Sequence, residues 1–183
     1  MSLRNVLLDP EQSVALDVRG STQAAVLVPL FMRGGELHAV FTLRRSDLRR
    51  HPGEISFPGG RREPGDPDLR TTALREAQEE IGLAADTVDV IGALQPTSTF
   101  VTSYAIYPFV GMVPAESPWT PQATEVAEVI ELPLPALTAG YGRRRITRRG
   151  MAIRTDTYVV GDHLIWGATA RVLTDLLDRV NLL

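Results

Sequence analysis

The chain has 183 residues, 44% of them hydrophobic, and a formal net charge of −3. This length and apolar content are enough for one globular core, so we expect a single domain over residues 1–183. There is no cysteine, and all 19 basic residues are arginine, which excludes disulfides, thiolate metal sites, cysteine nucleophiles and lysine Schiff bases.

Six segments have the apolar, β-branched composition that is typical of strands. In chain order they are residues 24–31, 37–43, 55–57, 88–94, 104–113 and 126–132. A turn at Gly34-Gly35 predicts that the first two form a β-hairpin. Pro58, Gly59 and Gly60 end the third segment, and we expect a glycine-rich loop to follow it.

A helix is predicted between the third and fourth of these segments. Asp66 followed by Pro67 has the pattern of an N-cap and a first helical residue. The helix should continue to about Ile81, because Gly82 can adopt the left-handed conformation that ends a helix.

The last third of the chain is predicted to contain two helices and a second hairpin. Residues 134–137 indicate a short helical turn, and residues 146–160 alternate as a hairpin that turns at Arg149-Gly150. Apolar residues recur at helical spacing over residues 164–180, which predicts an amphipathic helix packed on a sheet. The order of strands and helices favours an α/β sandwich with a mixed sheet between helices.

Three glutamates lie close together on the central predicted helix. At about 100° of rotation per residue, Glu76, Glu79 and Glu80 share an arc of about 100°. Ala77 and Ile81 fall beside this arc and predict a face that packs on the core. Such close carboxylates repel one another, and a divalent cation such as Mg²⁺ or Mn²⁺ would compensate. The alternative is a helix face that is simply solvated.

The residues around this helix resemble the signature of the Nudix hydrolases. In that signature a glycine and a glutamate precede the run Arg-Glu-X-X-Glu-Glu-X-Gly and an aliphatic residue. The matching residues are Gly60, Glu63 and Arg75-Glu76-Ala77-Gln78-Glu79-Glu80-Ile81-Gly82-Leu83. The gap from Gly60 to Arg75 is longer than in the commonest form, and Asp66 stands where a glutamate is usual.

The preceding segment is similar to one branch of this family, the coenzyme A pyrophosphatases. That branch has a threonine-X-arginine, a spaced arginine and a glycine before Phe-Pro-Gly-Gly. The matching residues are Thr42, Arg44, Arg49, Gly53 and Phe57-Pro58-Gly59-Gly60. Arg45 stands where the branch usually has serine or alanine. The sequence Trp166-Gly167-Ala168-Thr169-Ala170 is also similar to the C-terminal region of this branch.

The resemblance implies a Nudix α/β/α sandwich that binds Mg²⁺ or Mn²⁺. It implies Glu76 and Glu80 as metal ligands, with Gly60 adding its carbonyl oxygen. Glu79 would be a third ligand or the group that orients and deprotonates water. Arg75 would hold the glutamates in position.

Further candidates lie outside the helix. Arg44 and Arg49 precede the catalytic loop closely enough to hold substrate phosphates, and Thr42 belongs to the same motif. Glu125 lies where Nudix enzymes often place a further acid, with an ordinary surface glutamate as the alternative. The arginines within residues 143–149 indicate a solvated face, with phosphate or nucleic-acid contact as the alternative.

These features predict an enzyme that cleaves the diphosphate of coenzyme A or an acyl derivative, giving a 4′-phosphopantetheine compound and adenosine 3′,5′-bisphosphate. The alternatives are a Nudix hydrolase of ADP-ribose, a nucleoside triphosphate or a dinucleoside polyphosphate, and a non-catalytic nucleotide-binding module. The chain has no apolar run of about 18 residues and no signal-peptide pattern, so we expect a cytoplasmic protein without a membrane partner. The net charge favours a small nucleotide substrate over a nucleic acid. The chain could also form a homodimer, and the sequence does not decide this.

Overall fold

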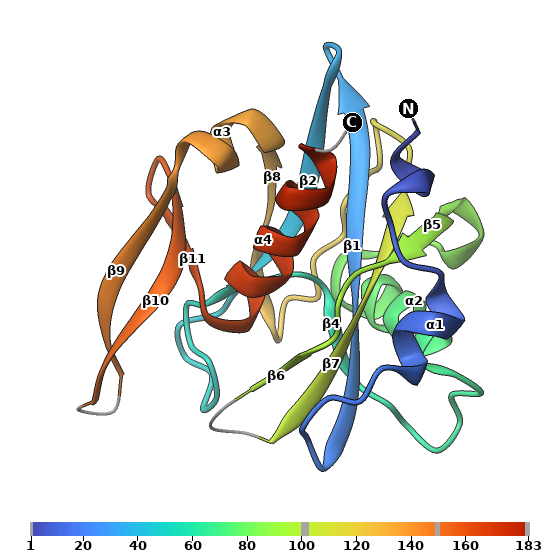
Figure 1. Ribbon diagram of the computed structural model, residues 1–183, viewed down its shortest axis with the longest axis horizontal. Coiled ribbons are helices and arrows are strands. Elements are labelled where there is room, and N and C mark those ends of the chain that lie inside the picture. The colour runs from blue at the N-terminus through green and yellow to red at the C-terminus, as the bar shows by residue number, and fades with distance from the viewer. Residues whose placement is uncertain (1, 100–102, 149–150, 182–183) are drawn as a thin grey trace.

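The computed structural model describes residues 2–99, 103–148 and 151–181 (Figure 1). In chain order the elements are the 3-10 helix η1 (Leu3–Asn5), α1 (Pro10–Ala15), β1 (Thr22–Arg33), β2 (Glu36–Arg44), β3 (Ile55–Ser56), β4 (Gly59–Arg61), α2 (Leu69–Ile81), the 3-10 helix η2 (Ala85–Thr87), β5 (Asp89–Ala93), β6 (Thr97–Ser98), β7 (Tyr104–Met112), β8 (Val126–Pro133), α3 (Leu134–Ala139), β9 (Tyr141–Arg148), β10 (Met151–Val160), β11 (His163–Trp166) and α4 (Gly167–Val180). Within this part of the chain, no helix is long and apolar enough to cross a membrane.

The larger sheet contains β1 to β8 and has the central strand order β3-β2-β1-β7-β5. Strand β1 pairs in parallel with β7 and antiparallel with β2 and β4, so the sheet is mixed. Strand β8 pairs with β2, and β6 pairs with β7. A second sheet has the order β11-β10-β9.

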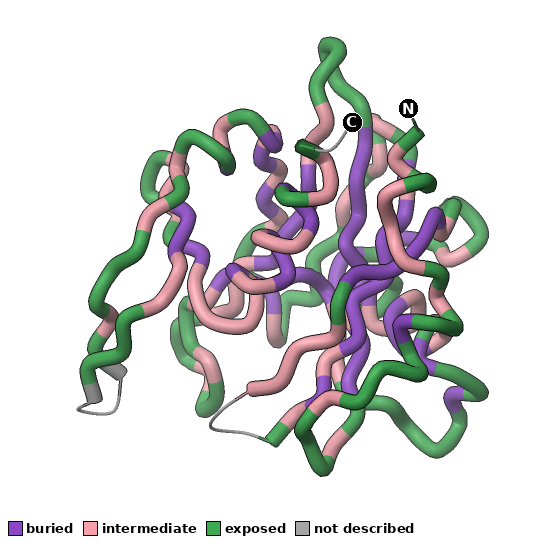
Figure 2. The backbone as a smooth tube through the Cα atoms, viewed as in Figure 1, coloured by how far each residue is buried: buried purple, intermediate pink, exposed green. Residues whose placement is uncertain are grey.

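Strand β1 is buried on both faces and separates two hydrophobic clusters. On one face Leu27 belongs to a cluster with Ala77 and Ile81 of α2. On the other face Val28 belongs to a cluster with Leu173 of α4. Successive residues of a strand point to opposite faces, so one strand can serve both clusters. The buried residues gather in the central strands (Figure 2). The predicted sandwich of helices around a mixed sheet is therefore confirmed.

Helix α2 begins later than the sequence predicted. Its N-cap is Asp68, whose side chain accepts a hydrogen bond from the Thr71 N–H at 2.7 Å, and the helix spans Leu69–Ile81. Asp66 lies in the loop before it with a buried carboxylate that accepts a hydrogen bond from Arg75. The prediction of an N-cap at Asp66 is wrong, because the carboxylate of Asp66 pairs with an arginine instead of capping the helix.

Two more predicted boundaries differ from the structure. Gly59–Arg61 forms strand β4 and pairs with β1, where a glycine-rich loop was expected. His163–Trp166 forms strand β11, so α4 begins at Gly167 rather than at residue 164. Ile165 is buried in this strand, which shows that an apolar residue at helical spacing can also belong to a preceding strand.

Most of the other predicted boundaries agree with the structure, but the start of the second hairpin does not. The β1–β2 hairpin turns at Gly34 and Gly35, both with positive φ, and Gly82 ends α2 with a φ of 72°. Strand β9 begins at Tyr141, earlier than residue 146. The turn expected at residues 149–150 lies outside the described residues.

Candidate functional site

The three glutamates of α2 lie in different environments. Glu80 is 5% exposed, and its Oε2 accepts a hydrogen bond from the Gly59 N–H at 3.2 Å. The side chain of Glu76 is 16% exposed and that of Glu79 is 53% exposed. The shared arc is therefore divided, with two carboxylates against the sheet and one in solvent.

The backbone of β4 approaches α2 so closely that no side chain fits at Gly60. A Cβ atom on Gly60 would lie 2.3 Å from Oε1 of Glu76. The pairing of β4 with β1 holds this stretch of backbone beside the helix. Gly60 is thus required by the close approach of the Glu76 carboxylate.

Arg75 is fixed by several hydrogen bonds. Its Nε and Nη2 donate to the two carboxylate oxygens of Asp66 at 3.0 and 3.1 Å, and its Nη1 donates to Glu79 at 3.1 Å. Its Nη2 also donates to the Arg61 carbonyl. Hydrogen bonding to Arg75 lowers the pKa of Asp66 to about 2. Arg75 therefore ties α2 to the loop before it, and sequence reasoning missed Asp66 as its partner.

The two carboxylates beside β4 are unequally compensated. Oε1 of Glu76 forms an ion pair with Nη2 of Arg75 at 3.1 Å, whereas Oε1 of Glu80 has Nη1 of Arg44 only at 3.9 Å. Burial raises the pKa of Glu80 to about 8, helped by the nearby Glu76 and opposed by the Gly59 N–H and Arg44. Burial also raises the pKa of Glu76. A divalent cation would stabilise both groups in their ionised form.

Two residues from other segments reach this cluster. Nη1 of Arg44, at the end of β2, lies 3.9 Å from Oε1 of Glu80 and 3.7 Å from Oε2 of Glu125. The Gln122 N–H donates to the Glu80 carbonyl at 2.9 Å, and the Arg45 N–H donates to the Glu125 carbonyl at 3.0 Å. The segment before β8 is thus bonded to the ends of both α2 and β2, which brings Glu125 to the carboxylates.

The other two predicted substrate-binding residues lie elsewhere. Thr42 is 1% exposed, and its hydroxyl donates to the Ser56 carbonyl at 3.2 Å. Its contacts therefore join β2 to β3 inside the sheet. Arg49 is exposed in the segment between these two strands.

The donor set suits a hard divalent cation. Glu76 and Glu80 provide four carboxylate oxygens beside the backbone of β4. In residues 2–99, 103–148 and 151–181, no group of three or more histidine, aspartate or glutamate side chains could hold a metal ion as it stands. A cation here would take its protein ligands from one or two carboxylates, as Mg²⁺ usually does, and complete its shell with backbone oxygen, water and substrate phosphate.

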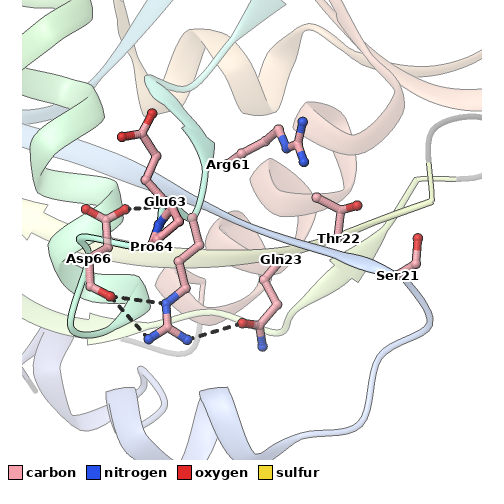
Figure 3. A pocket seen from close by; sticks show the side chains of 8 residues that line it. Ser21, Thr22, Gln23, Arg61, Glu63, Pro64 and Asp66 are labelled. Carbon is pink, nitrogen blue, oxygen red and sulfur yellow. Dashed lines mark hydrogen bonds between the residues drawn. The ribbon is translucent and has the colours of Figure 1, made fainter.

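An open pocket of about 510 Å³ is lined by the start of β1 and by the segment from Arg61 to Asp66 before α2 (Figure 3). Arg62 lines the pocket and donates hydrogen bonds to the Asp66 carbonyl and to the Gln23 side chain. Arg61 points away from these bonded groups (Figure 3). None of the predicted site residues lines this pocket, so it is distinct from the carboxylate cluster.

Comparison with known proteins places the chain in a family. The model of the NUDIX domain matches residues 21–149. An uncharacterized Nudix hydrolase, NudL, of Cronobacter sakazakii is 41% identical over 160 residues, which cover 86% of this chain and 82% of that protein. The NudL protein of Salmonella heidelberg is 37% identical over 176 residues, which cover 95% of this chain and 90% of its own.

Solved structures share the fold at lower identity. A MutT/nudix family protein from Enterococcus faecalis has a TM-score of 0.62 at 13% identity, over 93% of this chain and 66% of that one. A C. elegans Ap4A hydrolase in a binary complex has a TM-score of 0.53 at 16% identity, over 62% and 81% of the two chains. The NUDIX domain of Shewanella oneidensis NrtR, complexed with ADP ribose, has a TM-score of 0.53 at 15% identity, over 70% and 85%. These likenesses show the fold.

The Asp66–Arg75 pair predicts a stability effect. Asp66→Asn should lower the free energy of unfolding at neutral pH by about 2–3 kcal/mol, because it removes the carboxylate that Arg75 pairs with. The lowered pKa of Asp66 contributes stability above its unfolded value, so this difference should shrink as the pH falls from about 4 towards 2. Urea unfolding across this range measures it, with the exposed Asp17→Asn as control. Equal unfolding free energies for the two variants at neutral pH would show that the pair does not stabilise the fold.

The raised pKa of Glu80 predicts the opposite pH dependence. Without divalent cations, the folded protein keeps Glu80 protonated while the unfolded chain ionises, so wild-type stability should fall as the pH rises from about 4.5 to 8. Glu80→Gln removes this loss and should exceed wild type by about 2–4 kcal/mol near pH 8.5, with little difference near pH 5. Urea unfolding in chelator tests this, with the exposed Glu36→Gln as control. A difference that is the same at both pH values contradicts the assignment.

Proposed function

This chain belongs to the Nudix family, and we propose that it is a divalent-metal-dependent hydrolase of the diphosphate linkage in coenzyme A or its acyl derivatives. The products are 4′-phosphopantetheine, or its acyl form, and adenosine 3′,5′-bisphosphate. The observation that carries the proposal is the pair of carboxylates, Glu76 and Glu80, that lie against the glycine backbone of β4, with Arg44 beside Glu80.

Glu76 and Glu80 are the proposed ligands of Mg²⁺ or Mn²⁺. Gly60, through its carbonyl oxygen, and Glu79 are further candidates. When bound, the cation neutralises phosphate oxygens and lowers the pKa of water at the site. Arg75 keeps α2 and the loop before it in place, so that the two buried carboxylates stay beside β4.

The reaction is attack of water on one phosphorus of the diphosphate, with cleavage of the bond to the bridging oxygen. Glu79 or Glu125 accepts the proton of the attacking water, since both carboxylates are partly exposed beside the buried pair. Arg44 and the exposed Arg49 hold phosphate groups of the substrate through their guanidinium N–H groups. Thr42 fixes β2 to β3 and so supports Arg44 from within the sheet.

The choice of coenzyme A is supported by the residues before β4. Thr42, Arg44, Arg49 and Gly53 match the coenzyme A pyrophosphatase branch, and one of these arginines lies at the carboxylate cluster. The alternative is a Nudix hydrolase of ADP-ribose, a dinucleoside polyphosphate or a nucleoside triphosphate. Two of the fold neighbours are an Ap4A hydrolase and a domain complexed with ADP ribose, which keeps this alternative in view. A non-catalytic binding module is less well supported, because all three glutamates of the signature are present.

We also propose that residues 1–183 form a single domain. Helix α4 lies after the matched residues 21–149, yet its apolar residues belong to the same hydrophobic cluster as those of β1 and β2. Near the N-terminus, the Ser13 hydroxyl of α1 donates to the Leu94 carbonyl just after β5.

Glu80→Gln should reduce kcat by at least about 100-fold with Mg²⁺ or Mn²⁺, because it removes a charged ligand while keeping the shape of the side chain. Steady-state hydrolysis of coenzyme A measures this, with thermal unfolding to verify the fold. The control Glu36→Gln changes the same charge on the exposed β1–β2 hairpin and should leave kcat unchanged. Near-normal turnover by a folded Glu80→Gln protein would refute the proposed metal site.

A substrate panel separates the candidate functions. Coenzyme A and acetyl-coenzyme A should give a kcat/KM at least about 10-fold above ADP-ribose, Ap4A and nucleoside triphosphates, if the arginines before β4 recognise this substrate. Product analysis by chromatography should find adenosine 3′,5′-bisphosphate. Faster turnover of any of the other nucleotides would replace coenzyme A as the substrate. Tight nucleotide binding without turnover of any of them would favour the binding module.

A further inference from the structure

Arg44 is held at a junction of three segments. Its N–H donates to the Glu54 carbonyl at 3.0 Å, and the N–H of the next residue, Arg45, donates to the Glu125 carbonyl at 3.0 Å. The pairing of β2 with β8 is irregular between Leu43 and Arg44. The backbone of Arg44 is therefore fixed where β2 leaves the sheet beside the carboxylates.

The guanidinium of Arg44, in contrast, is held by charge rather than by hydrogen bonds. Its Nη1 lies 3.9 Å from Glu80 and 3.7 Å from Glu125, both beyond the usual hydrogen-bond limit of about 3.2 Å. Its Nε is buried and has no hydrogen-bond partner among the described residues. Because this guanidinium makes no bidentate contact with either carboxylate, moving it to another partner costs little interaction energy.

Arg75 provides the contrast within the same site. It donates to both carboxylate oxygens of Asp66 at 3.0 and 3.1 Å, and to Glu79 at 3.1 Å. One arginine of the site is thus fixed by hydrogen bonds, whereas Arg44 is shared loosely between two acids.

The contacts of Glu80 set Arg44 in competition with a cation. Oε2 of Glu80 accepts the Gly59 N–H, and Oε1 is the oxygen that faces Arg44. A divalent cation that took Oε1 would meet the guanidinium at the same oxygen, and two positive charges at such a separation repel each other. Binding of the cation and the observed position of Arg44 therefore disfavour each other.

We propose that Arg44 is an exchangeable counter-ion. Its guanidinium lies between the Glu80 and Glu125 carboxylates while no divalent cation is bound, and it gives way to the cation and turns to a phosphate of the substrate. Linkage makes the effect reciprocal, so removal of the guanidinium strengthens cation binding. The phosphate half of this inference rests on the proposed function, whereas the cation half is measured without substrate.

The test is Mn²⁺ affinity, measured by titration calorimetry without substrate on wild type, Arg44→Gln and Arg44→Met. Both variants remove the charge, and Arg44→Met also keeps an apolar stem if Arg44→Gln does not fold. Each should bind Mn²⁺ at least about 5-fold more tightly than wild type. The KM for coenzyme A should rise in the same variants, whereas a merely structural role would weaken both kinds of binding.

Two control variants distinguish competition between Arg44 and the cation from an effect of the protein's overall charge. Arg33→Gln removes one positive charge at the opposite end of the β1–β2 hairpin and should change Mn²⁺ affinity by less than about 2-fold, because screening weakens distant charges. Arg44→Lys keeps a cation and should bind Mn²⁺ nearly as wild type does. Unchanged or weaker Mn²⁺ binding in both neutral variants overturns the inference, and so does an equal gain in Arg33→Gln or no Mn²⁺ binding by any protein. None of these results depends on whether coenzyme A is the substrate.

Discussion

Burial of the Glu80 carboxylate is the constraint around which the site is built. A carboxylate with 5% exposure needs compensation when it ionises, and among the described residues one backbone N–H and one loosely placed arginine supply it. Burial with so little compensating positive charge raises the pKa of Glu80 to about 8. The neighbouring Glu76 raises this pKa further rather than lowering it. A site that keeps the Glu80 carboxylate so poorly compensated beside Glu76 is suited to a ligand that brings positive charge.

Strand β1 connects this site to the fold. It pairs with β2, which carries Arg44 at its end, and with β4, which carries the glycine backbone beside α2. One face of β1 belongs to the hydrophobic cluster that seats α2, and the other face belongs to the cluster that seats α4 (Figure 1). The positions of the arginine, the glycines and the glutamates therefore depend on the register of a single buried strand. The Asp66–Arg75 pair adds a second restraint, because it holds the loop that joins β4 to α2.

Sequence reasoning located the fold class, most strands and the glutamate helix, because these depend on local patterns of apolar residues and on glycine turns. The partners of individual polar side chains could not be predicted, because they depend on tertiary contacts. The Asp-Pro pattern does mark a helix start at Asp9 and Pro10, where the Asp9 side chain caps α1. In the same pattern at Asp66 and Pro67, the Asp66 carboxylate instead pairs with Arg75. Helical periodicity could not show that Glu80 is buried and Glu79 exposed, because both lie on the same arc. Thr42 matched a family motif, but burial in the sheet could not be predicted from the motif.

The central claim is that Glu76 and Glu80 together hold the divalent cation, and anomalous diffraction from crystals grown with Mn²⁺ tests it most directly. The claim predicts an anomalous peak about 2.0–2.3 Å from carboxylate oxygens of both residues. It also predicts that the guanidinium of Arg44 has moved away from Glu80. A peak bound by other residues, with Glu76 and Glu80 left as they are, would contradict it.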